Sequence, residues 1–263
     1  MKFIKKIFNF LLLSFFDFVS LKMNNKIKLI KKSDVKLKFY TPNKVVLYRA
    51  NTFFTKEPET IDWIENFKEK SVFWDIGSNV GVFACYAAKK KNCQVYAFEP
   101  SVFNLEILSK NIFINKLDDL ITILPLPLTN EMKVASFNMT SSIKGDAIST
   151  FGEEYSFDGS EIKTAFRYKT LGVKMDDIIK IFKLPFPDYI KIDVDGIEHL
   201  ILNGGEEVLK KTKEILIEIN DEFKIQEKKS IENLEKAGLS LYNKNSQGND
   251  KSKKIYNQIW KRK

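Results

Sequence analysis

Short apolar runs alternate with helical segments along most of this sequence, and this alternation constrains the fold more than any other feature. A short apolar run bounded by turn residues is typical of a strand buried on both faces of a sheet. The runs that we predict as strands are 71–76, 94–98, 121–126, 189–192 and 215–219. The helices predicted beside them are 60–67, 80–90, 101–115 and 198–210. This alternation predicts a mostly parallel α/β sheet with helices on both faces.

Composition excludes several other classes of protein. Of the 263 residues, 44% are apolar and 29% are charged, which is the balance of a globular protein. A disordered chain, a collagen-like repeat and a disulfide-stapled mini-protein are therefore excluded. The two cysteines, Cys85 and Cys93, lie in apolar stretches and lack the C-x-x-C spacing of a metal-ligand pair. We therefore expect a reducing compartment.

The net charge of +9 is distributed unevenly along the chain. Residues 1–50 hold 12 Lys/Arg and 2 Asp/Glu, and residues 244–263 hold 7 and 1, whereas residues 51–243 hold 24 and 31. An acidic middle between two basic ends indicates that an anionic partner would bind at the ends. We divide the chain into a basic N-terminal extension, 1–50, and a domain, 51–263.

The first 21 residues combine lysines with an interrupted apolar run. A transmembrane helix needs about 20 apolar residues, more than this run provides, and Asp17 argues against a signal peptide. On a helical wheel the lysines share one arc with Asn9, Asp17 and Ser20. This predicts an amphipathic helix, with residues 1–32 lying on an anionic membrane. The alternative is a helix docked on the protein or on a second subunit. We expect a cytoplasmic protein, peripheral on the inner face of the membrane.

The turn after the first predicted strand carries the clearest chemical signal, in the run VFWDIGSNVG. Asp75 ends the strand, and Gly77 follows where a side chain would block a ligand lying on the turn. Gly81 is expected to let the first helix pack closely on the strand. Glu99, at the end of the second strand, is suited to bind both hydroxyls of a ribose. Together these residues predict an adenosine-containing ligand at the carboxyl ends of the strands.

Two kinds of adenosine cofactor can be distinguished at this turn. A dinucleotide site needs G-x-G-x-x-G, whose backbone approaches a pyrophosphate. Here the spacing is G-x-N-x-G, and Asp75 would repel phosphates. S-adenosylmethionine carries an ammonium, a sulfonium and a ribose diol, without phosphate. The sequence therefore favours S-adenosylmethionine, with Ser78 and Asn79 in the cofactor turn. The weaker alternatives are a nicotinamide dehydrogenase and a pair of acids that only cap helices.

Several segments point to one family. They are VFWDIGSNVG (72–81), AFEP (97–100), VKMDDI (173–178) and IKIDVDGIE (190–198), the last followed by LNGG (202–205). Together they resemble the FkbM family of S-adenosylmethionine-dependent methyltransferases over roughly residues 57–220. The resemblance implies a class I methyltransferase fold, a seven-stranded sheet with one antiparallel strand. It also implies O-methylation, commonly of a hydroxyl on a glycan or a secondary metabolite.

The resemblance assigns individual residues by position. The run Glu57-Pro58-Glu59 is similar to the family's short motif before the first strand. The resemblance therefore implies that Glu57 lies at the cofactor site. Asp193 and Glu198 match the acids of the D-V-x-G-x-E run, and Asp195 replaces the family's usual Glu with a shorter carboxylate. The residues matching the cofactor turn and the ribose acid are Asp75, Gly77, Asn79, Gly81 and Glu99.

Methyl transfer to a hydroxyl requires alignment and a proton acceptor. Asp193 ends the fourth predicted strand, and Asp195 and Glu198 follow within one helical turn, so we predict these three residues as catalytic. We expect Lys191 to pair with one of these acids and His199 to lie on the helix surface. Three carboxylates this close could also hold a divalent metal, but no metal site is predicted.

Residues 130–170 interrupt the alternation and are rich in Ser, Thr, Gly and Phe. An insertion of this length is typical of a lid or substrate loop; the alternative is a β-hairpin that extends the sheet edge. We expect a small-molecule or lipid-linked glycan as acceptor. No nucleic acid is expected, because the domain is acidic and shows no basic aromatic groove. An RNA methyltransferase, prompted by the basic ends, and a non-catalytic membrane-attached module remain the alternatives.

Overall fold

The computed structural model describes residues 2–23, 26–246 and 254–262. Within these ranges the main sheet has seven strands. Their order across the sheet is β11 (Leu239–Ser246), β12 (Ile255–Arg262), β10 (Glu214–Asn220), β9 (Tyr189–Ile192), β3 (Val72–Ile76), β4 (Gln94–Phe98) and β5 (Ile121–Leu124). Strand β12 is antiparallel to both of its neighbours, and the pairs from β10 to β5 are parallel. The predicted α/β sheet with one antiparallel strand is confirmed.

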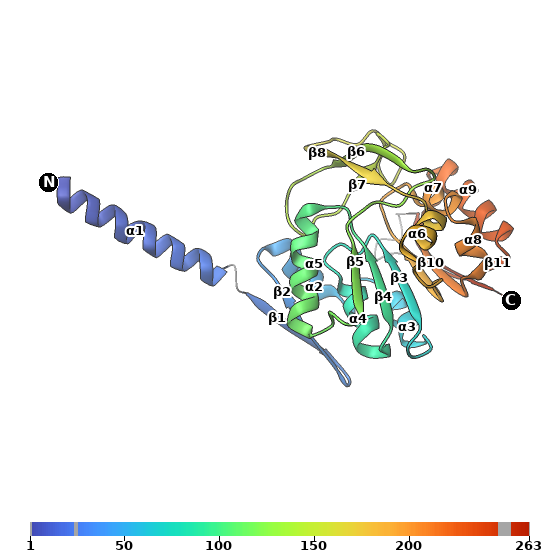
Figure 1. Cartoon of the computed structure of the whole chain (residues 1–263), viewed down its shortest axis with the longest axis horizontal. Coiled ribbons are helices and arrows are strands. Elements are labelled where there is room, and N and C mark those ends of the chain that lie inside the picture. The colour runs from blue at the N-terminus through green and yellow to red at the C-terminus, as the bar shows by residue number, and fades with distance from the viewer. Residues whose placement is uncertain (1, 24–25, 247–253, 263) are drawn as a thin grey trace.

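Helices cover both faces of this sheet (Figure 1). One face packs against α3 (Pro58–Glu65), α4 (Val82–Lys91) and α5 (Val102–Asn115), and we call it the α4 face. The opposite, α7 face packs against α6 (Met175–Phe182), α7 (Glu198–Asn203), α8 (Glu206–Lys211) and α9 (Lys224–Lys236). Successive strand residues point to opposite faces. Trp74 and Ile76 therefore pack in the core of the α7 face, whereas Phe73 packs in that of the α4 face.

The helix predicted over 198–210 is two helices, α7 and α8, separated by Gly204 and Gly205. A Cβ on Gly204 would lie 2.2 Å from the carbonyl oxygen of Thr129, and one on Gly205 would lie 2.1 Å from Cε of Met175. The single-helix prediction was therefore wrong at this point. The close approach of two neighbouring segments requires glycines, which favour a break in the helix.

Residues 26–52 pack onto the α4 face. They form a hairpin of β1 (Ile27–Lys32) and β2 (Val35–Tyr40), followed by α2 (Lys44–Thr52). Leu37 and Phe39 of β2 are fully buried. The side-chain amide of Asn115 accepts a hydrogen bond from the Lys38 amide at 2.8 Å and donates one to the Lys38 carbonyl at 2.7 Å. This hairpin and α2 therefore belong structurally to the body that carries the sheet.

Helix α1 (Lys2–Met23) extends away from this body (Figure 1). Its apolar side chains are exposed, for example Phe10 at 69% and Leu13 at 64%. Within the described part of the chain, none of the helices combines the length and the hydropathy that a bilayer span requires.

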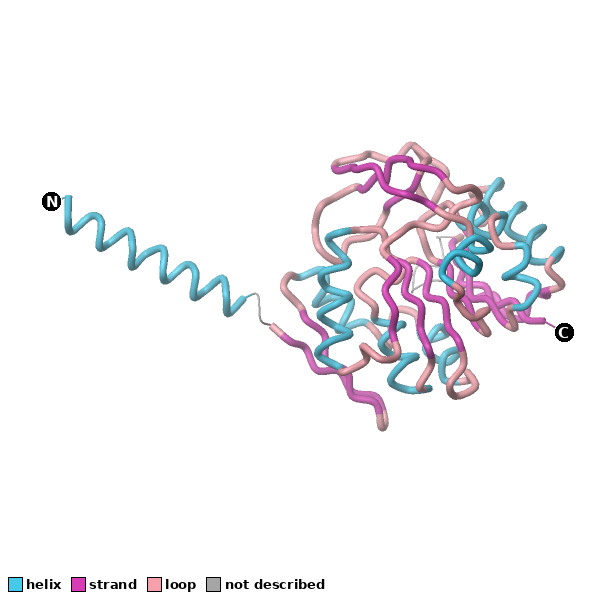
Figure 2. The backbone as a smooth tube through the Cα atoms, viewed as in Figure 1, coloured by secondary structure: helices cyan, strands magenta, loops and turns pink. Residues whose placement is uncertain are grey.

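The insertion at 130–170 forms a small sheet of its own, visible at the top of Figure 2. Its strands, in the order β7-β6-β8, are β7 (Ser149–Phe151), β6 (Lys133–Met139) and β8 (Phe166–Gly172), all antiparallel. Phe137 and Phe151 pack into the core of the α7 face. The insertion therefore covers one end of the main sheet and does not extend its edge.

Candidate active site

A cavity of about 550 Å³ lies where the small sheet meets the carboxyl ends of the main strands. Polar side chains enter it from several loops, and Phe98, Phe137 and Phe151 contribute apolar wall. The polar residues lining it are Asn79, Glu99, Asn104, Asp146, Ser149, Thr150, Asp193 and Asp195. The sequence predicted a ligand site at this end of the sheet, and the geometry supports that prediction.

Glu99 follows β4 and lines this cavity. One carboxylate oxygen accepts a hydrogen bond from the Asn79 amide at 2.7 Å, and the other accepts one from the Ser101 amide at 2.7 Å. Burial raises the pKa of Glu99 to about 7, although these backbone bonds act in the opposite direction. The two bonds fix a carboxylate at the cavity wall, where it can accept hydrogen bonds from a diol.

Gly77 begins the turn after β3, with φ of +84°. A Cβ at this position would lie 1.9 Å from the backbone oxygen of Asp193. Glycine is therefore required by the neighbouring loop itself, and not only by space for a ligand as the sequence suggested. A Cβ on Gly81, which has φ of +78°, would lie 2.3 Å from Cδ1 of Leu108 in α5. Its role is to let α4 approach α5, rather than the strand as predicted.

Ser78 and Asn79 have different positions in this turn. Ser78 is buried, and its hydroxyl donates to the backbone oxygen of Asp75 at 2.6 Å. Asn79 lines the cavity, and its side-chain amide donates to the carbonyl of Asp146 at 2.8 Å. Asn79 thus ties the turn to the loop at 140–148, which joins β6 to β7.

Asp75 does not line the 550 Å³ cavity. It is 1% exposed, and neither of its carboxylate oxygens has a hydrogen-bond partner among the described residues. Burial raises the pKa of Asp75 to about 6, although Lys191 on the adjacent strand acts in the opposite direction. The predicted arrangement, with Asp75 and Glu99 facing one cavity, therefore holds for Glu99 alone. Asp75 lies beside Lys191 at the carboxyl end of β3.

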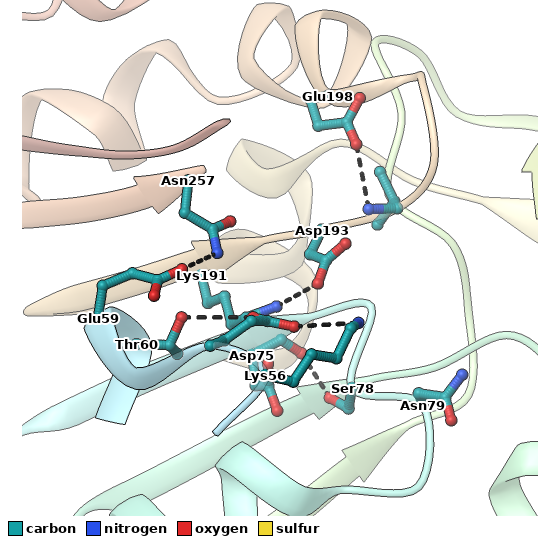
Figure 3. A network of polar contacts seen from close by, with 12 residues as sticks. Lys56, Glu59, Thr60, Asp75, Ser78, Asn79, Lys191, Asp193, Glu198 and Asn257 are labelled. Atoms are coloured by element: carbon teal, nitrogen blue, oxygen red, sulfur yellow. Dashed lines mark hydrogen bonds and ion pairs between the residues drawn. The ribbon is translucent and has the colours of Figure 1, made fainter. Parts of the chain in front are cut away.

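Lys191 lies at the centre of a buried network of carboxylates (Figure 3). Its Nζ atom is 2.6 Å from Oδ2 of Asp193, and the lysine is 1% exposed. Burial lowers the pKa of Lys191, but Asp193, Glu57 and Asp75 more than offset this effect and hold it above its ordinary value. The predicted pairing of Lys191 with an acid of the fourth strand is present.

Glu57 precedes α3 and is 4% exposed. Its Oε1 atom is 3.3 Å from Nζ of Lys56, and its Oε2 atom accepts a hydrogen bond from the Thr60 hydroxyl at 3.4 Å. Glu57 lines a second cavity, of about 300 Å³, together with Arg49, Lys56 and Phe83. The structure thus separates Glu57 from Glu99, with the Lys191–Asp193 pair close to both cavities.

Asp195 lies on the loop between β9 and α7 and lines the main cavity. Its Oδ2 atom accepts hydrogen bonds from the amides of Ile148 at 2.8 Å and Ser149 at 3.4 Å. Its backbone has φ of +63°, an uncommon value for a residue with a side chain. Burial and the charge of Asp193 raise the pKa of Asp195 to about 6. Asp193 and Asp195 are therefore together at one wall of the cavity.

Glu198 has a different position from the one predicted. It is fully buried and is absent from the lining of the main cavity. Its carboxylate accepts hydrogen bonds from the amides of Val194 at 3.1 Å and Gly196 at 3.0 Å, and from the Gln226 side chain. Glu198 thus holds the loop that carries Asp193 and Asp195, and the geometry supports a positioning role.

His199 is buried, at 3% exposure, so the expectation of a surface histidine was wrong. Its ring lies 6.2 Å from that of Phe223, at 80° between the planes. Burial lowers the pKa of His199 to about 4. A neutral histidine packed against an aromatic ring fits the interior of the protein.

The three carboxylates considered for a metal have separate partners. Asp193 pairs with Lys191. Asp195 accepts hydrogen bonds from the amides of Ile148 and Ser149, and Glu198 accepts them from the amides of Val194 and Gly196. Among the residues that the structure describes, no group of three or more His, Cys, Asp or Glu side chains is arranged to hold a metal ion.

Sequence reasoning missed several residues of the site. Asn104 of α5 and Asp146 of the 140–148 loop line the main cavity, and Arg49 of α2 lines the second cavity. Arg49 also donates from Nε to the carbonyl of Gly145 at 2.5 Å. These residues lie outside the motifs and contact the site across long sequence separations, so no local pattern marks them.

Comparison with known proteins identifies a family and similar folds. A family model described as Methyltransferase FkbM domain matches residues 75–239, more than half of the chain. The hexuronic acid methyltransferase AglP of Haloferax volcanii is 29% identical over 159 residues, which are 60% of this chain and 59% of that protein. The chain therefore matches less than two thirds of the length of this relative.

Two solved structures show the same fold. The methyltransferase FkbM from Methylobacillus flagellatus KT aligns with a TM-score of 0.50 at 15% identity, over 82% of this chain and 53% of that one. A putative S-adenosylmethionine-dependent methyltransferase from Streptococcus mutans aligns with a TM-score of 0.52 at 11% identity, over 89% and 55%. At these identities the likeness concerns the fold alone.

Proposed function

This chain belongs to the methyltransferase FkbM domain family, and we propose that it transfers a methyl group from S-adenosylmethionine to a hydroxyl of a sugar, a glycan or a related small molecule. The observation that carries the proposal is the cavity at the carboxyl ends of β3, β4 and β9, walled by Glu99, Asp193 and Asp195. Ligands of open α/β sheets bind at this end of the strands.

The residues present fit the cofactor. Glu99 offers a fixed carboxylate for the ribose diol. Asp75 has two buried carboxylate oxygens without partners among the described residues, and buried polar groups are normally hydrogen-bonded. Lys191 is surrounded by three carboxylates, those of Glu57, Asp75 and Asp193. An excess of carboxylates over ammonium groups favours a cationic ligand and disfavours phosphates.

Two neighbouring acids have roles in the transfer itself. S-adenosylmethionine supplies an activated methyl group when bound. Asp193, held ionised by Lys191, orients the acceptor and stabilises positive charge beside it. Asp195 has an Oδ1 atom with no hydrogen bond among the described residues, and it accepts the proton of the acceptor hydroxyl. Residues of the 140–148 loop and of β7 form part of the cavity wall.

The sugar acceptor is supported by the relative from Haloferax volcanii, whose name describes a hexuronic acid methyltransferase. We test the proposal with S-adenosylmethionine labelled in its methyl group and a panel of free, oligomeric and lipid-linked sugars, with and without carboxyl groups. We expect label in a sugar ether, and loss of this product in Asp195→Asn. A folded protein that binds the cofactor but labels no acceptor of the panel would contradict a sugar methyltransferase.

We also propose that α1 lies on an anionic membrane surface, which would place the enzyme on the inner, cytoplasmic face of a membrane beside lipid-linked glycans. The large apolar side chains between Ile7 and Phe18 are exposed, at 42–69%. Lysines follow in the hairpin, where Lys26, Lys28 and Lys31 are exposed. Exposed Phe and Leu side chains next to lysines suit the boundary between acyl chains and anionic headgroups.

A further inference from the structure

Three positive side chains lie close to the carboxylates of the site, and two of them are paired. Lys191 contacts Asp193 at 2.6 Å, and Lys56 contacts Glu57 at 3.3 Å. The third, Arg49, makes no ion pair with a carboxylate of the described residues. Its only hydrogen bond among them runs from Nε to the Gly145 carbonyl. Both terminal nitrogens of this guanidinium group are therefore available to a ligand.

The contacts of Gly145 fix the orientation of Arg49. The Gly145 amide donates to Oδ1 of Asn104 at 2.8 Å, and the Asn43 side chain donates to the carbonyl of the preceding residue, Lys144, at 2.9 Å. A Cβ on Gly145, which has φ of +83°, would lie 2.6 Å from Val46 of α2. The loop therefore lies directly on α2 and holds the Arg49 side chain through its Nε atom.

Arg49 lines the second cavity, and its charge acts on two carboxylates of the main cavity. It lines the 300 Å³ cavity with Lys56, Glu57 and Phe83. The Phe83 ring centroid is 5.0 Å from Nζ of Lys191, which in turn contacts Asp193 of the main cavity. Burial raises the pKa values of Asp195 and Glu99, and the charge of Arg49 opposes this rise in both. The guanidinium group is thus close to both cavities.

We propose that Arg49 binds a carboxylate at the site of methyl transfer, using the two terminal nitrogens that have no partner among the residues described by the structure. The inference rests on the proposed function. A guanidinium group held through Nε presents a planar pair of donors that matches a carboxylate. An anion entering this acidic site also needs a cation to offset repulsion by Asp193, Asp195 and Glu57. The carboxylate belongs either to the amino-acid end of the cofactor or to a uronic acid acceptor.

Calorimetry separates these two sources. S-adenosylhomocysteine carries the carboxylate, and 5′-methylthioadenosine has the same nucleoside and sulfur without it. If the cofactor is the source, Arg49→Gln weakens binding of the first by about 10- to 100-fold, as expected for hydrogen bonds to a charged group, and leaves the second unchanged. If the acceptor is the source, both nucleosides bind as before. The preference for uronic acid over neutral sugar acceptors then falls by a similar factor.

Matched variants control for charge and folding. Arg167→Gln removes the same charge from an exposed position on β8. It should change neither the binding of the two nucleosides nor the preference for uronic acid acceptors. Arg49→Lys keeps the positive charge but not the planar pair of donors. It should retain only part of the carboxylate binding that the wild type shows. A folded Arg49→Gln protein with wild-type nucleoside binding and wild-type acceptor preference would overturn the inference while leaving the proposed function intact. A wild-type protein that binds neither nucleoside would overturn both.

Discussion

Asp193 and Asp195 stand two residues apart on one loop, yet their surroundings give them different acid–base properties. Burial acts to raise both pKa values. Lys191 outweighs this effect at Asp193, whose pKa lies below its ordinary value. Asp195 has two backbone donors and a neighbouring negative charge, and its pKa rises to about 6. A proton acceptor works best when its pKa is near the working pH, so Asp195 is the better matched of the two.

This difference predicts a pH dependence of the reaction. Because the ionised form of Asp195 accepts the proton, kcat/KM should rise with pH and level off above an apparent pKa near 6. Asp195→Asn should lower kcat by about 10²–10⁴-fold, the usual contribution of a general base, and remove this limb. The measurement is a steady-state pH profile with labelled cofactor. An unchanged limb in the variant would assign it to another group.

Local sequence indicated acids at this end of the sheet, and three of them line the cavity, Glu99, Asp193 and Asp195. It did not indicate what each acid contacts. Glu198 shows the reason. An acid in the first turn of a helix interacts favourably with the helix dipole wherever its side chain points. Here it turns inward, because the amides of Val194 and Gly196 and the side chain of Gln226 are all available to it. The contact with Gln226 spans 28 residues, so a motif within one segment cannot reveal it.

At the scale of elements, the junction between the β3–α4 turn and the loop after β9 is the tightest part of the site. Gly77 donates from its amide to the Phe98 carbonyl at 3.0 Å, and its α-carbon faces the Asp193 carbonyl. One turn is thereby linked to the ends of both neighbouring strands. Small displacements here would move Glu99 and Asp193 relative to each other, so the glycine matters for geometry as well as for stability.

Replacing this glycine tests the junction. Gly77→Ala places a Cβ 1.9 Å from a backbone oxygen and should lower the free energy of unfolding by about 4 kcal/mol or more. Gly152→Ala is the matched control, because its φ of +74° is similar but its closest contact is the flexible Lys133 side chain at 3.2 Å. The control should cost about 1–2 kcal/mol from backbone conformation alone. Equal losses in urea unfolding would show that the contact with Asp193 is unimportant.

Elements that alternate regularly could be predicted from sequence, and elements defined by distant pairing could not. Strands β4 and β9 appear at the predicted residues because buried apolar runs mark them. The second half of strand β11, residues 243–246, carries Asn, Lys and Ser, a composition typical of a polar loop. It forms because β12, buried between β10 and β11, supplies backbone partners. The 140–148 loop is likewise fixed by Asn79 and Asp195, far away in the chain.

On the scale of the whole molecule, the N-terminal end combines net positive charge with exposed apolar surface. Residues 1–50 carry 12 basic and 2 acidic residues, whereas the domain around the site has an acidic balance. Helix α1 stands away from the body with its apolar side chains exposed (Figure 1). This arrangement allows the helix to lie on a membrane while the reaction site stays on a separate part of the molecule.

Vesicle flotation tests this arrangement. The full chain should float with vesicles that contain anionic lipid, less so with zwitterionic vesicles or at high salt, because salt screens surface charge. A chain lacking residues 1–23, and the full chain with Lys5→Glu and Lys6→Glu, should remain unbound. Lys163→Glu with Lys169→Glu, both at exposed positions of the small sheet region, is the matched control and should float. Equal flotation of all variants would exclude α1 as the membrane contact.

If the cavity beside Glu99 binds the nucleoside of S-adenosylmethionine, calorimetric titration with S-adenosylhomocysteine should detect that binding. We predict saturable one-site binding to the wild type. Glu99→Gln should weaken it by about 10- to 100-fold, because the uncharged amide is a poorer acceptor for a diol. Glu232→Gln, a change at an exposed position of α9, should bind as the wild type does. A folded wild-type protein that gives no binding, or a Glu99→Gln protein that binds equally well, would contradict the account.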